Sequence, residues 1–96
     1  MIVDDIYTFF RAVGATGSHA HFSVHHMAHR RRYYDYLRCS RAQPNVRAVL
    51  RLALTLLDMA MDNNLTADQN RRASDLGKRG FAYVIRRCRP DQPSKR

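Results

Sequence analysis

The chain has 96 residues, of which 45% are hydrophobic and 26% are charged; this is typical of one small globular domain and excludes a disordered segment. Seventeen Lys and Arg residues face eight Asp and Glu residues, giving a formal net charge of +9 and a pI near 10.6. This excess predicts an acidic partner, most commonly nucleic acid, although charge alone leaves an acidic protein or a membrane surface open.

The sequence has none of the usual features of exported or membrane proteins. Its two cysteines, Cys39 and Cys88, are too few for a disulfide scaffold. The N-terminus begins acidic, at Asp4 and Asp5, and no basic signal-peptide segment precedes an apolar one. The longest apolar stretch, residues 52–61, is too short to span a bilayer. We therefore expect a cytoplasmic protein with reduced thiols and no membrane partner.

In the first half of the chain, the apolar spacing predicts helices and no strand. A first helix is expected at about 4–13, where apolar residues recur at helical spacing and Gly14 provides a stop signal. Thr16 or Ser18 is suited to cap the segment that follows. We predict two short helices there, at about 18–27 and 30–39, with one continuous helix as the alternative.

The second half of the chain predicts two longer helices. A helix at about 45–62 is apolar on two sides, which places it at the centre of the core. Its neighbouring stripe of Leu52, Leu56 and Met59 exceeds what one monomer needs to bury. Thr66 and Gln69 then form a capping-box pattern that opens a last helix, at about 66–88.

The last helix contains two glycines and one cysteine on its apolar side. Gly77 and Gly80 lower helix propensity, so they indicate either close helix packing or a kink. Cys88 is expected to be a core residue. The fold prediction is therefore a small all-α domain of four or five helices at 1–89, with a helix-turn-helix at about 18–39, followed by a flexible tail at 90–96.

Between residues 18 and 57 several residue types recur at the positions of a known pattern. They are a capping Ser18, buried Phe22 and Met27, a turn at Ala28-His29-Arg30, inward Tyr33, Tyr36 and Leu37, and the segment Arg41 to Asn45 followed by Val46, Val49, Leu50 and Ala53. This pattern resembles the lambda-repressor-like (Cro/repressor class) helix-turn-helix DNA-binding family. The chain departs from the family at Ala28, where glycine is usual, and in a first helix that is one residue longer.

The resemblance implies that the helix at 30–39 enters the major groove of duplex DNA and that no cofactor is needed. Polar side chains from its N-terminal end would then reach base edges. For base contacts we select Arg30, Arg31, Tyr34 and Asp35, preceded by His29. For phosphate contacts we select Arg32, Arg38, Arg41 and Asn45, together with the free N–H groups of the helix that begins after Pro44.

Two other kinds of site were weighed for this stretch. His21, His25 and His29 are spaced four apart and would share one face of a continuous helix, as a zinc site requires, but no cysteine pair or carboxylate completes the ligand set. Cys39 beside histidines could suggest a thiolate nucleophile, but the chain has no phosphate loop, paired carboxylates or nucleophile elbow. We therefore expect neither a metal site nor an enzyme.

The sequence leads to one main hypothesis and two alternatives. The main one is a sequence-specific transcriptional regulator, associated with the nucleoid, that forms a homodimer through Leu52, Leu56 and Met59 with the Phe81 and Val84 face. The first alternative is a small basic inhibitor of phage or mobile-element type that binds an acidic protein. The second is non-specific or RNA binding, in which Tyr33 or Tyr34 stacks on bases.

Overall fold

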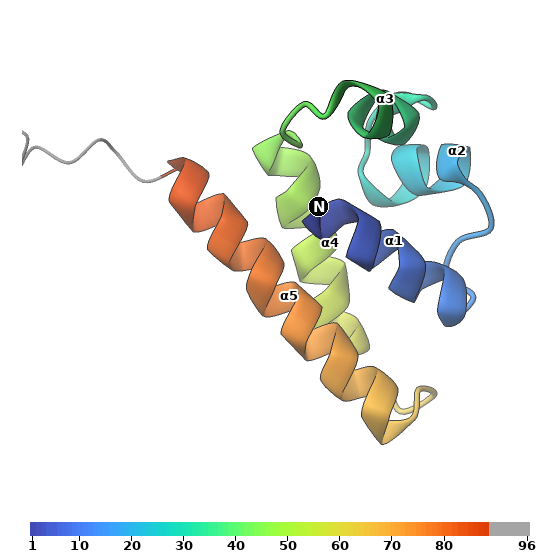
Figure 1. Cartoon of the computed structure of the whole chain (residues 1–96). Helices are drawn as coiled ribbons and strands as arrows, with labels where there is room; N and C mark the ends of the chain where they lie inside the picture. Colours follow the sequence, from blue (N-terminus) through green and yellow to red (C-terminus); the bar gives the residue numbers. More distant parts are fainter. Residues whose placement is uncertain (89–96) are drawn as a thin grey trace, which may run out of the picture.

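The computed structural model describes residues 1–88, which contain five α-helices, one π-helical turn and no strand (Figure 1). In chain order the elements are α1 (Ile2–Ala12), α2 (His19–His21), the π-helical turn η1 (Phe22–His26), α3 (Tyr33–Ser40), α4 (Val46–Met59) and α5 (Ala67–Cys88). The predicted all-α class is confirmed. The predicted tail, 90–96, lies outside the described residues. None of the helices in residues 1–88 is both long enough and apolar enough to cross a membrane.

Helices α4 and α5 form an antiparallel hairpin that supports the rest of the domain (Figure 1). The two glycines of α5 bring the helices together: a Cβ added at Gly80 would lie 3.1 Å from the Cβ of Ala53, and one at Gly77 would lie 3.1 Å from Cδ2 of Leu57. Helix α5 runs unbroken through both positions. Close packing, and not a kink, is therefore the reason for these glycines.

Polar caps define where three of the helical segments begin. The Ser18 hydroxyl accepts a hydrogen bond from the His21 N–H at 3.1 Å, as the sequence predicted. Thr66 and Gln69 form the predicted reciprocal capping box, with bonds of 2.9 and 3.1 Å. Asn45 caps α4 by accepting hydrogen bonds from two backbone N–H groups of its first turn.

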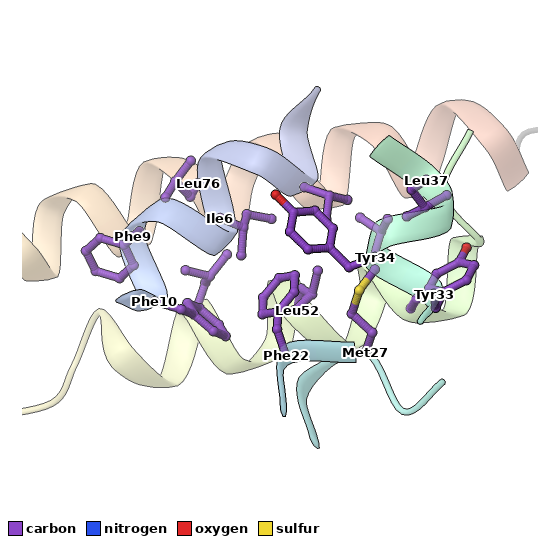
Figure 2. Packing of buried hydrophobic residues seen from close by; sticks show 14 of the residues in the cluster. Ile6, Phe9, Phe10, Phe22, Met27, Tyr33, Tyr34, Leu37, Leu52 and Leu76 are labelled. Atoms are coloured by element: carbon purple, nitrogen blue, oxygen red, sulfur yellow. The ribbon is translucent and has the colours of Figure 1, made fainter. Parts of the chain in front are cut away.

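One hydrophobic cluster joins α1, η1, α3, α4 and α5 (Figure 2). Phe10 of α1 and Phe22 of η1 are fully buried and meet edge to face, with ring centroids 5.6 Å apart. Met27 and Leu37 contribute from either side of the turn before α3, and Leu52 contributes from α4. The turn and α3 are therefore held on the hairpin by the same core that stabilises α1.

Several side chains differ in exposure from what their spacing predicted. Leu52 and Leu56 are fully buried within the single chain, because η1 packs against α4 and α1 packs against α5 in the α4–α5 hairpin. They are therefore not available for a dimer. Cys88 is exposed and not in the core, and Tyr36 is 48% exposed instead of facing inward.

Candidate nucleic-acid interface

The predicted turn that separates the two helical segments lies between η1 and α3, at residues 27–32. In η1 the backbone widens, so that the Met27 N–H bonds the Phe22 carbonyl at 3.0 Å and the His29 N–H bonds the Ser23 carbonyl at 2.9 Å. Such a π-helical turn accommodates one extra residue. Ala28 follows with φ of 53°, the left-handed conformation that normally favours glycine. The π-helical turn and the left-handed Ala28 together end the first helical segment before α3 begins.

A buried serine fixes the position of α3 relative to the first helical segment. The Ser23 side chain is fully buried; its hydroxyl donates to the His19 carbonyl at 2.9 Å and accepts the Tyr34 N–H at 3.0 Å. It therefore satisfies a backbone donor in the first turn of α3 that would otherwise lack a partner. The sequence alone does not identify Ser23 as a residue that positions α3, because a small polar residue between apolar neighbours carries no specific signal.

Arg30, Arg31 and Arg32 lie in the turn that leads into α3 and not within the helix, which begins at Tyr33. All three side chains are exposed, and none has a carboxylate within 4 Å among residues 1–88. The start at Tyr33 places Asp35 in the first turn of α3, where a carboxylate is favourable beside the positive end of the helix dipole.

Tyr34 and Asp35, which we predicted to contact bases, both have partners within the chain. Tyr34 is only 2% exposed, and its hydroxyl donates to Oδ1 of Asp4 at 2.5 Å. Burial first, and the bond to Asp4 second, raise the pKa of Tyr34 well above its usual range. Tyr34 is therefore not available for a base contact, and this part of the prediction is wrong. Oδ1 of Asp35 lies 2.6 Å from Nδ1 of His19, but the Asp35 side chain is still 43% exposed, so its base contact stays a prediction.

The remaining predicted residues are placed around the turn and at the end of α3. His29 stacks on Tyr33, with ring centroids 3.6 Å apart, and its Nδ1 accepts the Arg30 N–H at 3.0 Å. Arg38 is exposed, with its guanidinium 5.9 Å from the centre of the Tyr34 ring. Arg41, also exposed, ends α3 in a left-handed conformation with φ of 58°.

Asn45 has a structural role that differs from the predicted phosphate contact. Its side-chain oxygen accepts the N–H groups of Arg47 at 2.9 Å and Ala48 at 3.2 Å, and its own N–H donates to the Tyr33 hydroxyl at 2.7 Å. Two of the N–H groups expected to bind a phosphate are therefore already satisfied. Asn45 instead couples the start of α4 to the start of α3.

The outer face of α3 carries a residue that the sequence analysis assigned to the core. Tyr36 is exposed and lies one turn after Arg32, on the same side of the helix. An open groove of about 1090 Å³ runs beside it, between the turn and the first turn of α4, and Arg30, Arg47 and Arg87 contribute to its walls. Counting the helix from Tyr33 would have identified Tyr36, but nothing in the sequence places Arg87 there.

The end of α5 is tied to this groove by a short chain of hydrogen bonds. The Tyr83 hydroxyl donates to the Pro44 carbonyl at 2.6 Å, and Arg87 donates both to that hydroxyl, at 2.9 Å, and to the Gln43 side chain. Burial raises the pKa of Tyr83, so this hydroxyl remains protonated and able to donate at neutral pH. These contacts hold Arg87 beside the start of α4.

The aspartates of residues 1–88 either have partners or lie in the second half of the chain. Three of those with partners come before α4: Asp4 bonds Tyr34, Asp5 bonds Arg79 and Asp35 bonds His19. The other aspartates in residues 1–88 lie along the second half of α4, the loop after it and the first half of α5; they are Asp58, Asp62, Asp68 and Asp75. The turn before α3, and the start of α4 beside it, are therefore the strongly basic end of the domain.

The histidines do not form one row. The rings of His21 and His25 lie 4.4 Å apart, whereas the turn between η1 and α3 directs His29 towards Tyr33. Within residues 1–88, no three His, Cys, Asp or Glu side chains are grouped so that they could hold a metal ion. His26 is half-buried, and its Nε2 lies 3.0 Å from the Ala15 carbonyl oxygen.

His26 provides a prediction about pH. Burial, opposed in part by the bond to Ala15, lowers its pKa below 6.5, so the folded protein favours the neutral ring. The unfolded chain then binds more protons, and this stabilisation is complete above about pH 6.5 and is lost as the pH falls below it. We expect His26→Gln to reduce the difference in Tm between pH 7.5 and pH 5.5, measured by circular dichroism. An unchanged difference would contradict this role.

Comparison with known proteins identifies a family but no function. No curated protein and no solved structure matches the chain. A model described as a family of unknown function (DUF6626) matches residues 3–93. The chain therefore belongs to the DUF6626 family.

Proposed function

We propose that this chain is a sequence-specific DNA-binding regulator that places α3 in the major groove. The observation that carries the proposal is the set of three consecutive exposed arginines, Arg30 to Arg32, directly before α3 and without carboxylate partners in the described residues. Arginine binds phosphates and guanine edges in a two-point manner. With this function the protein would be associated with the nucleoid.

The arrangement of the helical segments supports this proposal. Helix α3 has eight residues and is therefore about 12 Å long, comparable to the roughly 12 Å width of the major groove. The α2–η1 segment precedes it across a tight turn, the order found in helix-turn-helix proteins, where the first helix crosses the DNA backbone. Of the matching positions, Phe22, Met27, Tyr33 and Leu37 are buried as the resemblance implies, whereas Tyr36 is exposed.

The placement of the side chains refines the proposed contacts. Tyr36 is exposed on α3 and Arg32 is exposed at the residue directly before it, so we assign them, with Arg31, to base edges. The other exposed arginines around this face are assigned to phosphates; they are Arg30, Arg38, Arg41 and Arg47. Phosphate contacts position the protein, whereas base-edge contacts determine its sequence preference.

Selection of bound duplexes from a random pool tests the proposal directly. We expect one sequence motif to be enriched and its binding to weaken steeply with salt, because phosphate contacts release counterions. Absence of binding even at low salt would overturn the proposal and favour an acidic protein partner for Arg30 to Arg32. Equal affinity for random duplexes and single strands would also contradict it, because sequence-specific binding requires a preferred duplex.

Single variants separate the two kinds of contact. Arg32→Ala is expected to relax the preference at one base position of the selected motif, with a loss of about 1–3 kcal/mol for the preferred base. Arg41→Ala should instead weaken all sequences about equally. Arg72→Ala serves as the control, because it removes the same charge from an exposed site near the start of α5. Fluorescence anisotropy on the selected duplex and its point variants measures all three.

A further inference from the structure

The exposed side of α4 carries a charge pattern that is complementary to the same pattern on a second helix running in the opposite direction. Arg51, Leu54 and Asp58 are exposed and follow one another at spacings of three and four residues, so they form one row along the helix. Leu54, which is 50% exposed, is the apolar member of this row and lies between the two charges. The row is thus basic towards the start of α4, apolar at its centre and acidic towards its end.

Within one chain, the two charged members of this row cannot reach each other. Arg51 and Asp58 are seven residues apart, which is about 10 Å along the helix axis. Among residues 1–88, neither side chain lies within 4 Å of an opposite charge. Both charges are therefore left to solvent in the monomer.

We propose that a second copy of this chain docks on this row, with the two α4 helices antiparallel about a two-fold axis beside Leu54. This axis places Arg51 of each copy opposite Asp58 of the other and brings the two Leu54 side chains together. An isologous interface of this kind requires a surface that is complementary to itself, and the row fulfils this requirement.

The charges of the row also argue against the other surfaces that could cover it. Asp58 makes its second half unfavourable for nucleic acid, since phosphates repel carboxylates. A membrane surface would require a continuous apolar face, whereas Arg51 and Asp58 flank the single exposed leucine. The half-buried Leu50 and Leu57 border the row and extend its apolar centre for a packed partner helix.

The interface does not depend on DNA binding, so it can be tested on the protein alone. Sedimentation equilibrium over a concentration series is expected to show a reversible dimer for the wild-type chain. Arg51→Asp should raise the dimer dissociation constant on the order of a hundredfold, because like charges then meet on both sides of the axis. Asp58→Arg should have a similar effect. The double variant Arg51→Asp with Asp58→Arg should restore the dimer, because each pair is then reversed.

Two controls make the result specific to this row. Arg72→Asp changes the net charge as Arg51→Asp does, but outside the row, and should leave the dimer intact. Leu54→Glu should give a monomer, whereas Ile85→Glu, at a side chain of α5 that is 51% exposed, should not. Circular dichroism checks that each variant is folded.

Several outcomes would overturn the proposal. If the wild-type chain stays monomeric across the concentration series, the proposed dimer does not form, and the row faces solvent or a different protein. A double variant as dissociated as the single variants excludes the Arg51–Asp58 pairing. Dissociation by Ile85→Glu but not by Leu54→Glu moves the interface to α5. None of these results bears on DNA binding by the turn and α3, so the two proposals fail separately.

Discussion

Simultaneous replacement of Arg30, Arg31 and Arg32 by alanine is expected to lower affinity for the selected duplex by more than a hundredfold. Each base or phosphate contact by arginine contributes roughly 1–3 kcal/mol, and three such losses together exceed the 2.8 kcal/mol or so that corresponds to two orders of magnitude. For each phosphate contact that is lost, the slope of log affinity against log salt should also fall by about 0.9. Anisotropy titrations at several salt concentrations measure both quantities.

The matched control for this variant is a triple replacement of Arg71, Arg72 and Lys78, which removes three positive charges from exposed positions of α5. If both triple variants lose affinity to the same extent, binding depends on net charge alone and the proposed site is wrong. Folding is not expected to account for the loss. Removing three cations from the positive end of α3 relieves an unfavourable interaction, so the Tm should stay the same or rise.

Phe22→Ala is expected to have the largest effect on stability. The Phe22 ring is fully buried and contacts the rings of Tyr7, Phe10 and Tyr34, at centroid distances of 5.1, 5.6 and 5.2 Å. Removing a buried phenyl ring lowers the free energy of unfolding by about 3–5 kcal/mol. The total stability of a small domain is about 5–15 kcal/mol, so a large part of it would be lost. Chemical denaturation followed by circular dichroism measures the change.

Val24→Ala, two residues away in the same π-helical turn, is the control for this effect. Val24 is 39% exposed, so its truncation should change the free energy of unfolding by less than about 0.5 kcal/mol. A similar loss in both variants would mean that the turn, and not the aromatic cluster, limits stability. Phe22 belongs to η1, which precedes the turn before α3. The Phe22 variant is therefore also expected to bind DNA less tightly, to the extent that it is unfolded.

The proposed dimer and the proposed DNA contact have one joint consequence. A two-fold axis beside Leu54 would present two copies of α3 related by that axis. If both proposals hold, the selected duplex should contain an inverted repeat, because the symmetry of the site mirrors that of the protein. Leu54→Glu would then weaken binding to the full repeat far more than binding to one half-site.

The sequence by itself determined those features that depend on local interactions. Apolar spacing along 45–62 and 66–88 predicted α4 and α5. Ser18 and Thr66 predicted the caps of α2 and α5, because a cap bonds backbone groups only two or three residues away. The break after Met27 and the exposure of Arg30 to Arg32 follow in the same way from a short turn and adjacent charges.

The tertiary structure alone decided which side of each helix is covered. Starting α3 at Tyr33, three residues later than predicted, turned Tyr34 towards Asp4 and left Tyr36 exposed, because each residue rotates the helical face by about 100°. Leu52 is buried because η1 packs against α4, on the hairpin that α4 forms with α5. These contacts join residues far apart in the chain, and no local pattern specifies their partners.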